Sequence, residues 1–220
     1  MSKVKTHWIN YKKYFKSNWK KVIAGYVIML CAFFIFYAID QVTKTLLFYH
    51  VDVNAMEAAG KSTWTLNGGT ITNVNPEAIF PDSSQQINYA GVFGIRSIWH
   101  KGVTFLSTNN IAFIQVVSFI IAIAILLVPL YPSKLSLIYC AFFGILLAGD
   151  LGNATDRVAF SGYVKDEFFV PWLDKGTFNF ADITVFIGVI LIMCTIVVTT
   201  IMEIVKEKKE KTEKTENPKS

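Results

Sequence analysis

Charged residues are scarce in this chain of 220 residues, where they make up 17% of the sequence against 53% for hydrophobic residues. A water-soluble domain of this length has difficulty covering its surface with so few polar groups. Cysteine is rare too, and Cys31, Cys140 and Cys194 fall in three separate apolar stretches. Thiols in such stretches behave as small hydrophobes, so we expect no disulfides and no redox chemistry. The composition predicts a membrane protein.

Sequence patterns for binding metals are missing as well. The histidines His7, His50 and His100 match no metal-ligand spacing, which favours ordinary surface or interface positions. We therefore expect neither a metal nor a cofactor. The net charge of +5 is explained by membrane topology and lipid contact, and it requires no nucleic-acid partner.

Four apolar stretches are each long enough to cross a hydrocarbon core, which needs about 20 residues of helix. We place these spans at about residues 22–48, 111–131, 135–153 and 182–205. The first is long and aromatic-rich and ends without an Ala-x-Ala pattern, so we expect it to remain in the mature protein. Around this membrane domain of residues 22–205 we expect a basic tail (1–21), outer loops at about 49–110 and 154–181, and a charged tail (206–220).

Lysines predict how the spans are oriented. Residues 1–21 hold seven lysines and no acid, the turn at 131–134 holds another lysine, and the tail at 206–220 holds six more. Because cytoplasmic flanks are enriched in lysine and arginine, we expect both termini in the cytoplasm and both long loops outside. The N-terminal lysines are also expected to contact anionic lipid headgroups, each contributing about 1 kcal/mol. Both tails are expected to be loose, the second as a frayed helix or disordered chain.

The first outer loop contains a hairpin signal. Residues 62–66 and 70–74 are β-prone runs, and Asn67, Gly68 and Gly69 separate them. We expect a small sheet here, lying on the outer face of the membrane.

Two acids flank the sequence Phe-Asn-Phe-Ala at residues 178–181, where a loop gives way to the last span. They are Asp166 and Asp182. An acid at the edge of a bilayer is unfavourable unless it is paired, hydrated or used, so it is a functional candidate. Two carboxyl groups facing one cavity can share a proton and activate water, because like charges at short range do not both ionise easily.

Two further pairs of polar residues are each four positions apart, the spacing that places two side chains on one face of a helix. Asp40 and Lys44 are four residues apart in the first span, so they share a helix face and can form an ion pair. This pair fits either mutual neutralisation near the interface or direct substrate contact. In the run from Gly149 to Arg157, glycines allow close helix approach, and Asn153 and Arg157 can point donors at one spot. Taken alone, that run also fits a polar helix terminus with self-contained hydrogen bonds.

These segments occur in one order along the chain, together with Asn88 in residues 88–94 and Asp166 in residues 164–169. The order resembles the lipoprotein signal peptidase family, the type II signal peptidases, over about residues 40–187. The resemblance implies an all-α integral membrane protein with four transmembrane helices and a small extracytoplasmic β-cradle. It also implies an aspartic endopeptidase of the bacterial cell membrane, active near the outer leaflet, which removes the signal peptide from diacylglyceryl-modified prolipoproteins. Globomycin-type cyclic peptides are then expected to inhibit it.

The resemblance implies roles for individual residues. It places the catalytic pair at Asp166 and Asp182. The substrate-binding or supporting positions are Asp40, Lys44, Asn88, Gly149, Asn153, Arg157, Asn179 and Ala181. This sequence departs from the family at Asp150, where a small residue is usual, and at Lys165 and Glu167, which add charges beside Asp166. Four small residues are expected to leave room for a lipidated substrate, namely Gly149, Gly152, Ala154 and Ala181.

Two other chemistries remain open at this point. A serine–lysine peptidase would use Ser161 and Lys165, although both are expected in a polar loop without the apolar pocket that activates such a lysine. A small transporter or lipid-binding scaffold, which is not an enzyme, would instead use Asp40 and Asp150 as a polar path through the membrane.

Overall fold

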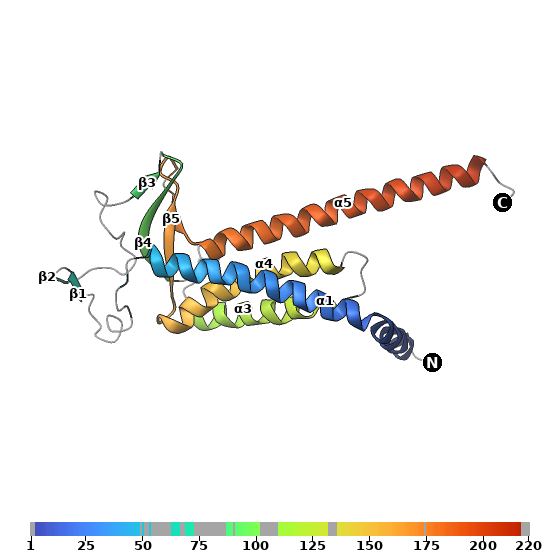
Figure 1. Cartoon of the computed structure of the whole chain (residues 1–220), viewed down its shortest axis with the longest axis horizontal. Coiled ribbons are helices and arrows are strands. Elements are labelled where there is room, and N and C mark those ends of the chain that lie inside the picture. The colour runs from blue at the N-terminus through green and yellow to red at the C-terminus, as the bar shows by residue number, and fades with distance from the viewer. Residues whose placement is uncertain are drawn as a thin grey trace.

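The computed structural model describes residues 3–48, 50, 53, 63–66, 69–72, 87–89, 91–101, 110–131, 136–173 and 175–216. Side chains are described for residues 12, 14–48, 50, 53, 91–101, 110–131, 136–173 and 175–209. Within these ranges the chain forms a bundle of long helices with a small sheet at one end (Figure 1).

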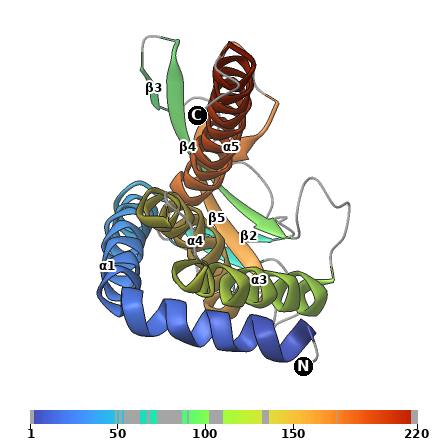
Figure 2. The same cartoon turned by 90° about the vertical axis from the view of Figure 1, so that its right-hand side faces the viewer.

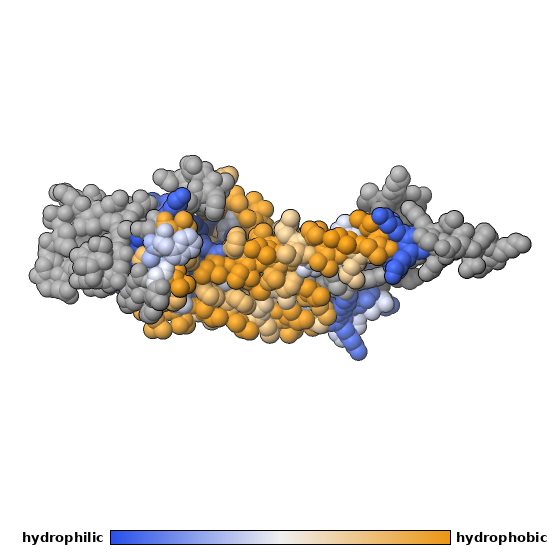
Figure 3. Space-filling view, turned by 90° about the horizontal axis from the view of Figure 1, so that it is seen from above, coloured by the Kyte–Doolittle hydropathy of each residue, from blue (hydrophilic) through white to orange (hydrophobic). Residues whose placement is uncertain are grey.

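The helices are α1 (Lys3–Leu46), α3 (Ile111–Leu126), α4 (Ser136–Ala159) and α5 (Phe180–Glu216), and a 3-10 turn, η1 (Val128–Leu130), follows α3. Four segments are long and apolar enough to cross a membrane: Tyr14–Leu46, Ile111–Leu130, Ser136–Ala159 and Phe180–Lys209. Large apolar side chains on them face outward, and Phe34, Ile120 and Phe186 are 61%, 60% and 68% exposed. Figure 3 shows the resulting apolar belt. The predicted multi-pass membrane protein is confirmed.

Helices α1, α4 and α5 are longer than the spans predicted from hydropathy alone, whereas α3 ends at Leu126, before the predicted end at residue 131. The tail expected to be loose is helical from Lys3, with a break at Asn18, whose backbone leaves the helical region (φ −120°, ψ 15°). Before this break α1 runs across the end of the bundle (Figures 1 and 2). At the other terminus α5 continues to Glu216. Lysine and glutamate are good helix formers, so a polar sequence can extend a helix that an apolar span has already nucleated.

The central helix is α4, which packs against the other three. It comes close to α1 at Gly144, where a Cβ would overlap the backbone of Met29. Beside this contact lies a cluster of buried side chains contributed by α1, α3 and α4: Met29, Ala122, Ile125, Cys140 and Leu147. Small residues thus bring the helix backbones together where lipid supplies no hydrophobic drive for association.

The strands form two antiparallel sheets. The predicted hairpin is present as β1 (Thr63–Leu66) and β2 (Gly69–Thr72), with Trp64 opposite Ile71. The second sheet has the order β3 (Ile87–Tyr89), β4 (Phe93–Lys101), β5 (Tyr163–Phe169) and β6 (Thr177–Phe178). It lies at the end of the bundle opposite the first residues of α1 and the last residues of α5 (Figure 1).

The second outer loop is more ordered than predicted. Instead of ending near Asn153, α4 continues to Ala159, and β5 follows after a tight turn. Ser161 and Gly162 have positive φ values of 51° and 91° in this turn. Glycine suits position 162 because it adopts a positive φ without strain. It also avoids a close contact, since a Cβ there would lie 2.7 Å from Ile111 Cγ1. The turn brings β5 back beside the end of α4 and so positions Asp166.

Candidate active site

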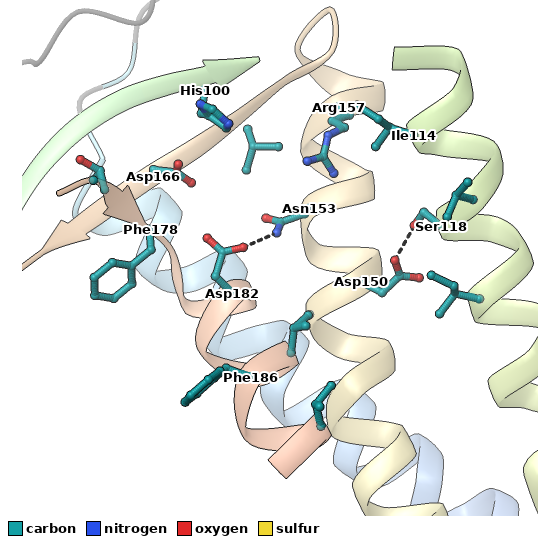
Figure 4. A pocket seen from close by; sticks show the side chains of 18 of the residues that line it. His100, Ile114, Ser118, Asp150, Asn153, Arg157, Asp166, Phe178, Asp182 and Phe186 are labelled. Atoms are coloured by element: carbon teal, nitrogen blue, oxygen red, sulfur yellow. Dashed lines mark hydrogen bonds between the residues drawn. The ribbon is translucent and has the colours of Figure 1, made fainter. Parts of the chain in front are cut away.

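A pocket of about 700 Å³ lies between α3, α4, α5 and the strands β5 and β6. Its walls are mainly apolar, with a few polar side chains pointing inward (Figure 4). Of the predicted site residues, five contribute to its lining: Gly149, Asn153, Arg157, Asp166 and Asp182. The structure therefore brings together residues from α4, β5 and α5 around one cavity.

Asp182 lies in the first turn of α5, where reciprocal capping bonds position it. Oδ1 of Asn179 accepts from the backbone N–H of Asp182 (2.9 Å), and Oδ2 of Asp182 accepts from the backbone N–H of Asn179 (3.2 Å). Such a capping box pairs N–H groups that a helix end otherwise leaves free. Asn153 of α4 donates from Nδ2 to the other oxygen, Asp182 Oδ1, over 2.8 Å. Two donors and the positive end of the helix dipole suit an ionised carboxylate.

Asp166 lies in β5 opposite Ile98 of β4, and only 6% of it is exposed. Its Oδ1 accepts from Asn179 Nδ2 at 2.8 Å. Burial raises the pKa of Asp166 well above its usual range, and the nearby charge of Asp182 raises it further. Asp166 therefore favours the protonated form. Its carboxyl group faces the same pocket as Asp182 (Figure 4).

Asn179 connects both aspartates to α4. Its side chain is fully buried, and Nδ2 lies 2.8 Å from Asp166 Oδ1, 2.9 Å from Asn153 Oδ1 and 3.2 Å from the carbonyl oxygen of Lys165. Two amide hydrogens are thus shared among three acceptors. Because the backbone N–H of the same residue bonds to Asp182, one residue sets the positions of both carboxyl groups.

Asp40 and Lys44 form a buried scaffold behind the pocket. Lys44 Nζ lies 3.0 Å from Asp40 Oδ2, 3.0 Å from Asp156 Oδ2 and 3.2 Å from Asn153 Oδ1. Asp40 Oδ1 accepts from the backbone N–H of Ala181 at 2.8 Å, which pairs another free group at the start of α5. Neither Asp40 nor Lys44 is among the described residues that line the pocket. The geometry thus favours the structural interpretation of this ion pair over direct substrate contact.

The small residues near the site serve helix packing. A Cβ on Gly149 would overlap the carbonyl oxygen of Ala181 and lie 2.5 Å from Thr184 Oγ1. A Cβ on Gly152 would lie 2.7 Å from Asp40 Oδ2. Ala181 itself is completely buried. A Cβ at Gly149 would thus meet α5 and one at Gly152 would meet α1, so both glycines allow close helix packing. Gly149 also lines the pocket, and the expectation that these small residues leave room for a substrate stays a prediction.

The two extra charges beside Asp166 are buried in β5. Lys165 is 7% exposed, its Nζ lies 4.2 Å from the ring centre of Phe160, and burial lowers its pKa. The polar loop expected around it is thus a buried strand. Ser161 is exposed in the preceding turn, and neither residue lines the pocket in the part of the chain that the structure describes. This arrangement gives no support to a serine–lysine peptidase.

Glu167 is completely buried on the opposite side of β5 from Asp166. Neither carboxyl oxygen has a hydrogen bond of good geometry among the described residues. The nearby Thr43 hydroxyl donates its hydrogen to the carbonyl oxygen of Asp40 instead, at 2.9 Å. Burial raises the pKa of Glu167 to about 8, although the charge of Lys44 opposes the shift.

Several residues of the site were not singled out from the sequence. His100 lines the pocket on β4, and Ser118 lines it on α3. Arg96 holds the β6 side of the pocket in place, donating from Nε to Thr177 Oγ1 (2.8 Å) and from Nη2 to the carbonyl oxygen of Gly176 (3.3 Å). Periodicity offered no signal for these residues, because their partners lie in distant segments.

Two of the sequence predictions concern binding, namely the supporting role of Asn88 and the expected absence of a metal. Asn88 lies in β3 opposite Gly94, and its side chain is outside the described residues. Among the residues that the structure does describe, no three His, Cys, Asp or Glu side chains gather closely enough to hold a metal ion. The described pocket is lined by carboxyl, amide, guanidinium, amino, hydroxyl and imidazole groups.

Comparison with known proteins adds a family match. The family model for signal peptidase (SPase) II matches residues 32–198. A lipoprotein signal peptidase of Thermosynechococcus vestitus is 30% identical over 104 residues, which cover 47% of this chain and 65% of that protein. One of Enterococcus faecalis is 33% identical over 87 residues, covering 40% of this chain and 53% of that protein. The matches thus span less than two thirds of these two relatives.

Solved structures agree with the fold. One bacterial membrane enzyme has a TM-score of 0.55 at 22% identity, covering 78% of this chain and 88% of its own. A second has a TM-score of 0.53 at 23% identity, covering 76% and 91%. At this level of identity the similarity concerns the arrangement of helices and strands.

Proposed function

This chain belongs to the signal peptidase II family, and we propose that it is a membrane aspartic endopeptidase that removes the signal peptide from diacylglyceryl-modified prolipoproteins, cutting before the lipidated cysteine. The observation that carries the proposal is the shared pocket of Asp166 and Asp182, with Asn179 bonded to both. Helix capping, burial and helix packing together position these two side chains.

The different surroundings of the two aspartates divide the catalytic work. Asp182, with its donors from Asn153 and Asn179, acts as the base that takes a proton from water as the water attacks the scissile carbonyl. Asp166, kept protonated by burial, donates to the carbonyl oxygen as the tetrahedral intermediate forms. Asp182, which is now protonated, then delivers its proton to the leaving amine. These two roles describe the reactive form of the pair.

The pocket also suits a lipidated peptide. Its walls are mainly apolar, and they open between helices whose outer surfaces face lipid. A diacylglyceryl anchor would keep the cysteine at the depth where α4 and α5 meet the sheet. Arg157 lines this end of the pocket and is placed to hold a substrate carbonyl oxygen.

The orientation of the chain follows from its charges. The lysine-rich start of α1 and the lysine-rich end of α5 lie at the same end of the molecule, away from the sheet (Figure 1). Because lysines are in excess at this end, we place both termini in the cytoplasm. The sheet and the two aspartates then lie near the outer leaflet. The segment of α1 before Asn18 would then lie along the inner surface, with its lysines near anionic headgroups.

A cyclic peptide inhibitor of the globomycin type would compete for the same pocket. It would block cleavage by occupying the space between Asp166, Asp182 and Arg157. The transporter alternative lacks comparable support, because Asp40 is paired with Lys44 behind the pocket.

The test is cleavage of a diacylglyceryl-modified prolipoprotein by the purified protein in detergent. We expect the wild type to release the signal peptide, and Asp166→Asn and Asp182→Asn to lose turnover while keeping the wild-type thermal unfolding profile and substrate binding. Thr155→Ala, on the exposed side of α4, serves as a control that should cleave normally. A folded wild type that leaves the substrate uncut, or a folded aspartate variant that still cleaves at the wild-type rate, would refute the proposal.

A further inference from the structure

Lys165, which the proposed mechanism does not use, lies directly before Asp166 in β5. Because successive side chains of a strand point to opposite faces, Lys165 lies on the side of β5 away from Asp166 and the pocket. It is 7% exposed, although a lysine is rarely buried unless its ammonium group has a partner. The groups that hold Lys165 in place therefore also bear on the position of Asp166.

Three aromatic rings surround the ammonium group of Lys165. Its Nζ lies 4.2 Å from the ring centre of Phe160, 5.7 Å from that of Trp99 and 5.9 Å from that of Phe48. The Trp99 ring packs against the other two, with its centre 4.9 Å from that of Phe48 and 5.1 Å from that of Phe160. An ammonium group is attracted to the negative faces of aromatic rings, more strongly where water is excluded. We call Lys165 and these three rings the lysine cage.

The lysine cage joins three parts of the chain. Phe48 follows α1, Phe160 follows α4, and Trp99 belongs to β4, where it is the direct cross-strand partner of Lys165. The buried acid Asp156 is engaged elsewhere, because its Oδ2 accepts from Lys44 Nζ at 3.0 Å and from the backbone N–H of Lys165 at 3.2 Å. The rings are thus the partners of the ammonium group, and the cage ties β5 to the ends of two helices.

The backbone of Lys165 is held at both of its hydrogen-bonding groups. Its N–H donates to Asp156 Oδ2 of α4, and its carbonyl oxygen accepts from Asn179 Nδ2 at 3.2 Å. Asn179 in turn bonds to Asp166 and to Asp182. A shift of Lys165 would therefore disturb the residue that sets the positions of both carboxyl groups.

Anchoring at Lys165 matters because the pairing of the strands is irregular beside Asp166. The strands β4 and β5 pair Ile95 with Phe168 and then Ile98 with Asp166, so β4 has one residue more than β5 between these pairs. A bulge of this kind interrupts the ladder of hydrogen bonds and lets a strand bend. Regular pairing continues from Asp166 on one side only, through Lys165.

Resting on the proposed function, we infer that Lys165 is a positioning residue: the lysine cage fixes β5 beside the bulge and so holds Asp166 in place opposite Asp182 for the attack of water. Lys165 is not among the described residues that line the pocket, so it acts through Asp166 and not on the substrate. Removing its charge should therefore lower turnover more than it weakens substrate binding.

The experiment compares Lys165→Met and Lys165→Arg with wild type, using the purified full-length protein and a diacylglyceryl-modified prolipoprotein. Methionine keeps an apolar side chain of similar length without the charge, whereas arginine keeps a cation that stacks on aromatic rings. We expect Lys165→Met to lower kcat about tenfold with little change in KM, and Lys165→Arg to retain most of the wild-type kcat. Thermal unfolding measured alongside ensures that the rates compare folded proteins.

Two further variants separate the cage from general packing. Phe160→Leu removes one ring of the cage and keeps an apolar side chain, so it should also lower kcat, and it replaces Lys165→Met in the comparison if that variant does not fold. Combined with Lys165→Met it should add little, because both changes remove the same contact. Lys101→Met is the matched control: Lys101 Nζ lies 4.7 Å from the ring centre of Tyr163 at the end of the same two strands, and kcat should not change.

Amide hydrogen exchange around Asp166 supplies a measurement that does not need turnover. Lys165→Met should speed this exchange, and Lys165→Arg should not. A folded Lys165→Met with the wild-type kcat, or an arginine variant as slow as the methionine variant, overturns the inference while leaving the proposed function intact. If wild type cuts no substrate, the proposed function fails, and exchange alone decides the cage: faster exchange in Lys165→Met supports it, and unchanged exchange overturns it.

Discussion

Asn153 donates a hydrogen bond from Nδ2 to Asp182 Oδ1 over 2.8 Å, linking the central helix α4 to the first turn of α5. Oδ1 of the same amide accepts from Asn179 Nδ2 at 2.9 Å and from Lys44 Nζ at 3.2 Å. Both ends of the amide are therefore committed, and its plane is held. Asp182 consequently points into the pocket in one orientation, which is the requirement for a base that acts on a bound water.

Replacing Asn153 with alanine should lower kcat for prolipoprotein cleavage by about 100-fold with a smaller change in KM, because a misplaced catalytic group has such an effect even when substrate still binds. Steady-state kinetics on lipidated peptide will measure the two constants. Thr155→Ala, two residues along the same helix but exposed, is the control and should behave like wild type. A wild-type kcat in Asn153→Ala would show that this hydrogen bond does not position Asp182 for turnover.

Replacing Lys44 with methionine should destabilise the protein by about 3–5 kcal/mol, because it leaves the buried carboxylates of Asp40 and Asp156 without their cation. Thermal unfolding in detergent checks this, with Lys20→Met on the exposed surface as the control. The double variant Lys44→Met/Asp156→Asn should recover part of the loss, since it removes one unpaired charge. A single variant as stable as wild type would contradict the role of Lys44 as a shared partner.

The stability of the protein should fall as pH rises from 5 to 8 because of Glu167. Its pKa is about 8 in the folded protein, against an ordinary value of 4.5, so the folded state holds a proton that the unfolded chain has released across this interval. The free energy of unfolding then decreases by up to about 1.4 kcal/mol for each pH unit, and the effect ends above the folded pKa. Unfolding temperatures at several pH values will show the slope.

Glu167→Gln supplies the comparison for that slope. The amide cannot ionise, so the variant should unfold at temperatures that depend less on pH, and its advantage over wild type should grow toward pH 8. Glu203→Gln, on the exposed surface of α5, should keep the wild-type slope. Parallel curves for wild type and Glu167→Gln would mean that the buried carboxyl does not release its proton in this range.

Substituting Gly149 with alanine should separate α4 from α5 near the aspartates. The new methyl group would overlap the Ala181 carbonyl oxygen, so we expect a loss of about 1–3 kcal/mol in stability and reduced cleavage. Gly25→Ala is a graded comparison, because its Cβ would meet Cys140 Sγ at 3.0 Å, a side-chain atom with more freedom to move. Equal effects of the two substitutions on cleavage would argue against a special role for the approach at Gly149.

Some of the site could be predicted because it depends on local spacing. The four-residue separation of Asp40 and Lys44 predicted an ion pair, and the pair is present at 3.0 Å. The prediction was incomplete, because Asp156 of α4 is the second acid on Lys44. Helix periodicity specifies which residues share a face, but it does not specify which other helix that face meets.

Burial was harder to predict than position. Lys165 and Glu167 were expected as extra charges in an outer loop, yet both lie in β5 and are 7% and 0% exposed. A charged residue in a short polar segment gives no local sign that it will be enclosed. Its enclosure depends on the residues that follow α1. There the ring centre of Phe48 lies 4.9 Å from that of Trp99 on β4, and this packing helps to cover the strand.

The membrane class, the number of spans, the charge asymmetry of the ends and the order of the polar motifs could all be predicted, because hydropathy and residue spacing are local properties of a chain. Which of those motifs meet depends on how the helices pack in three dimensions. The hydrogen bond from Ala181 to Asp40 joins residues 141 apart, and that from Lys44 to Asn153 joins residues 109 apart. Such contacts arise from close packing of α1, α4 and α5 at glycines and alanines, which a linear pattern permits but does not specify.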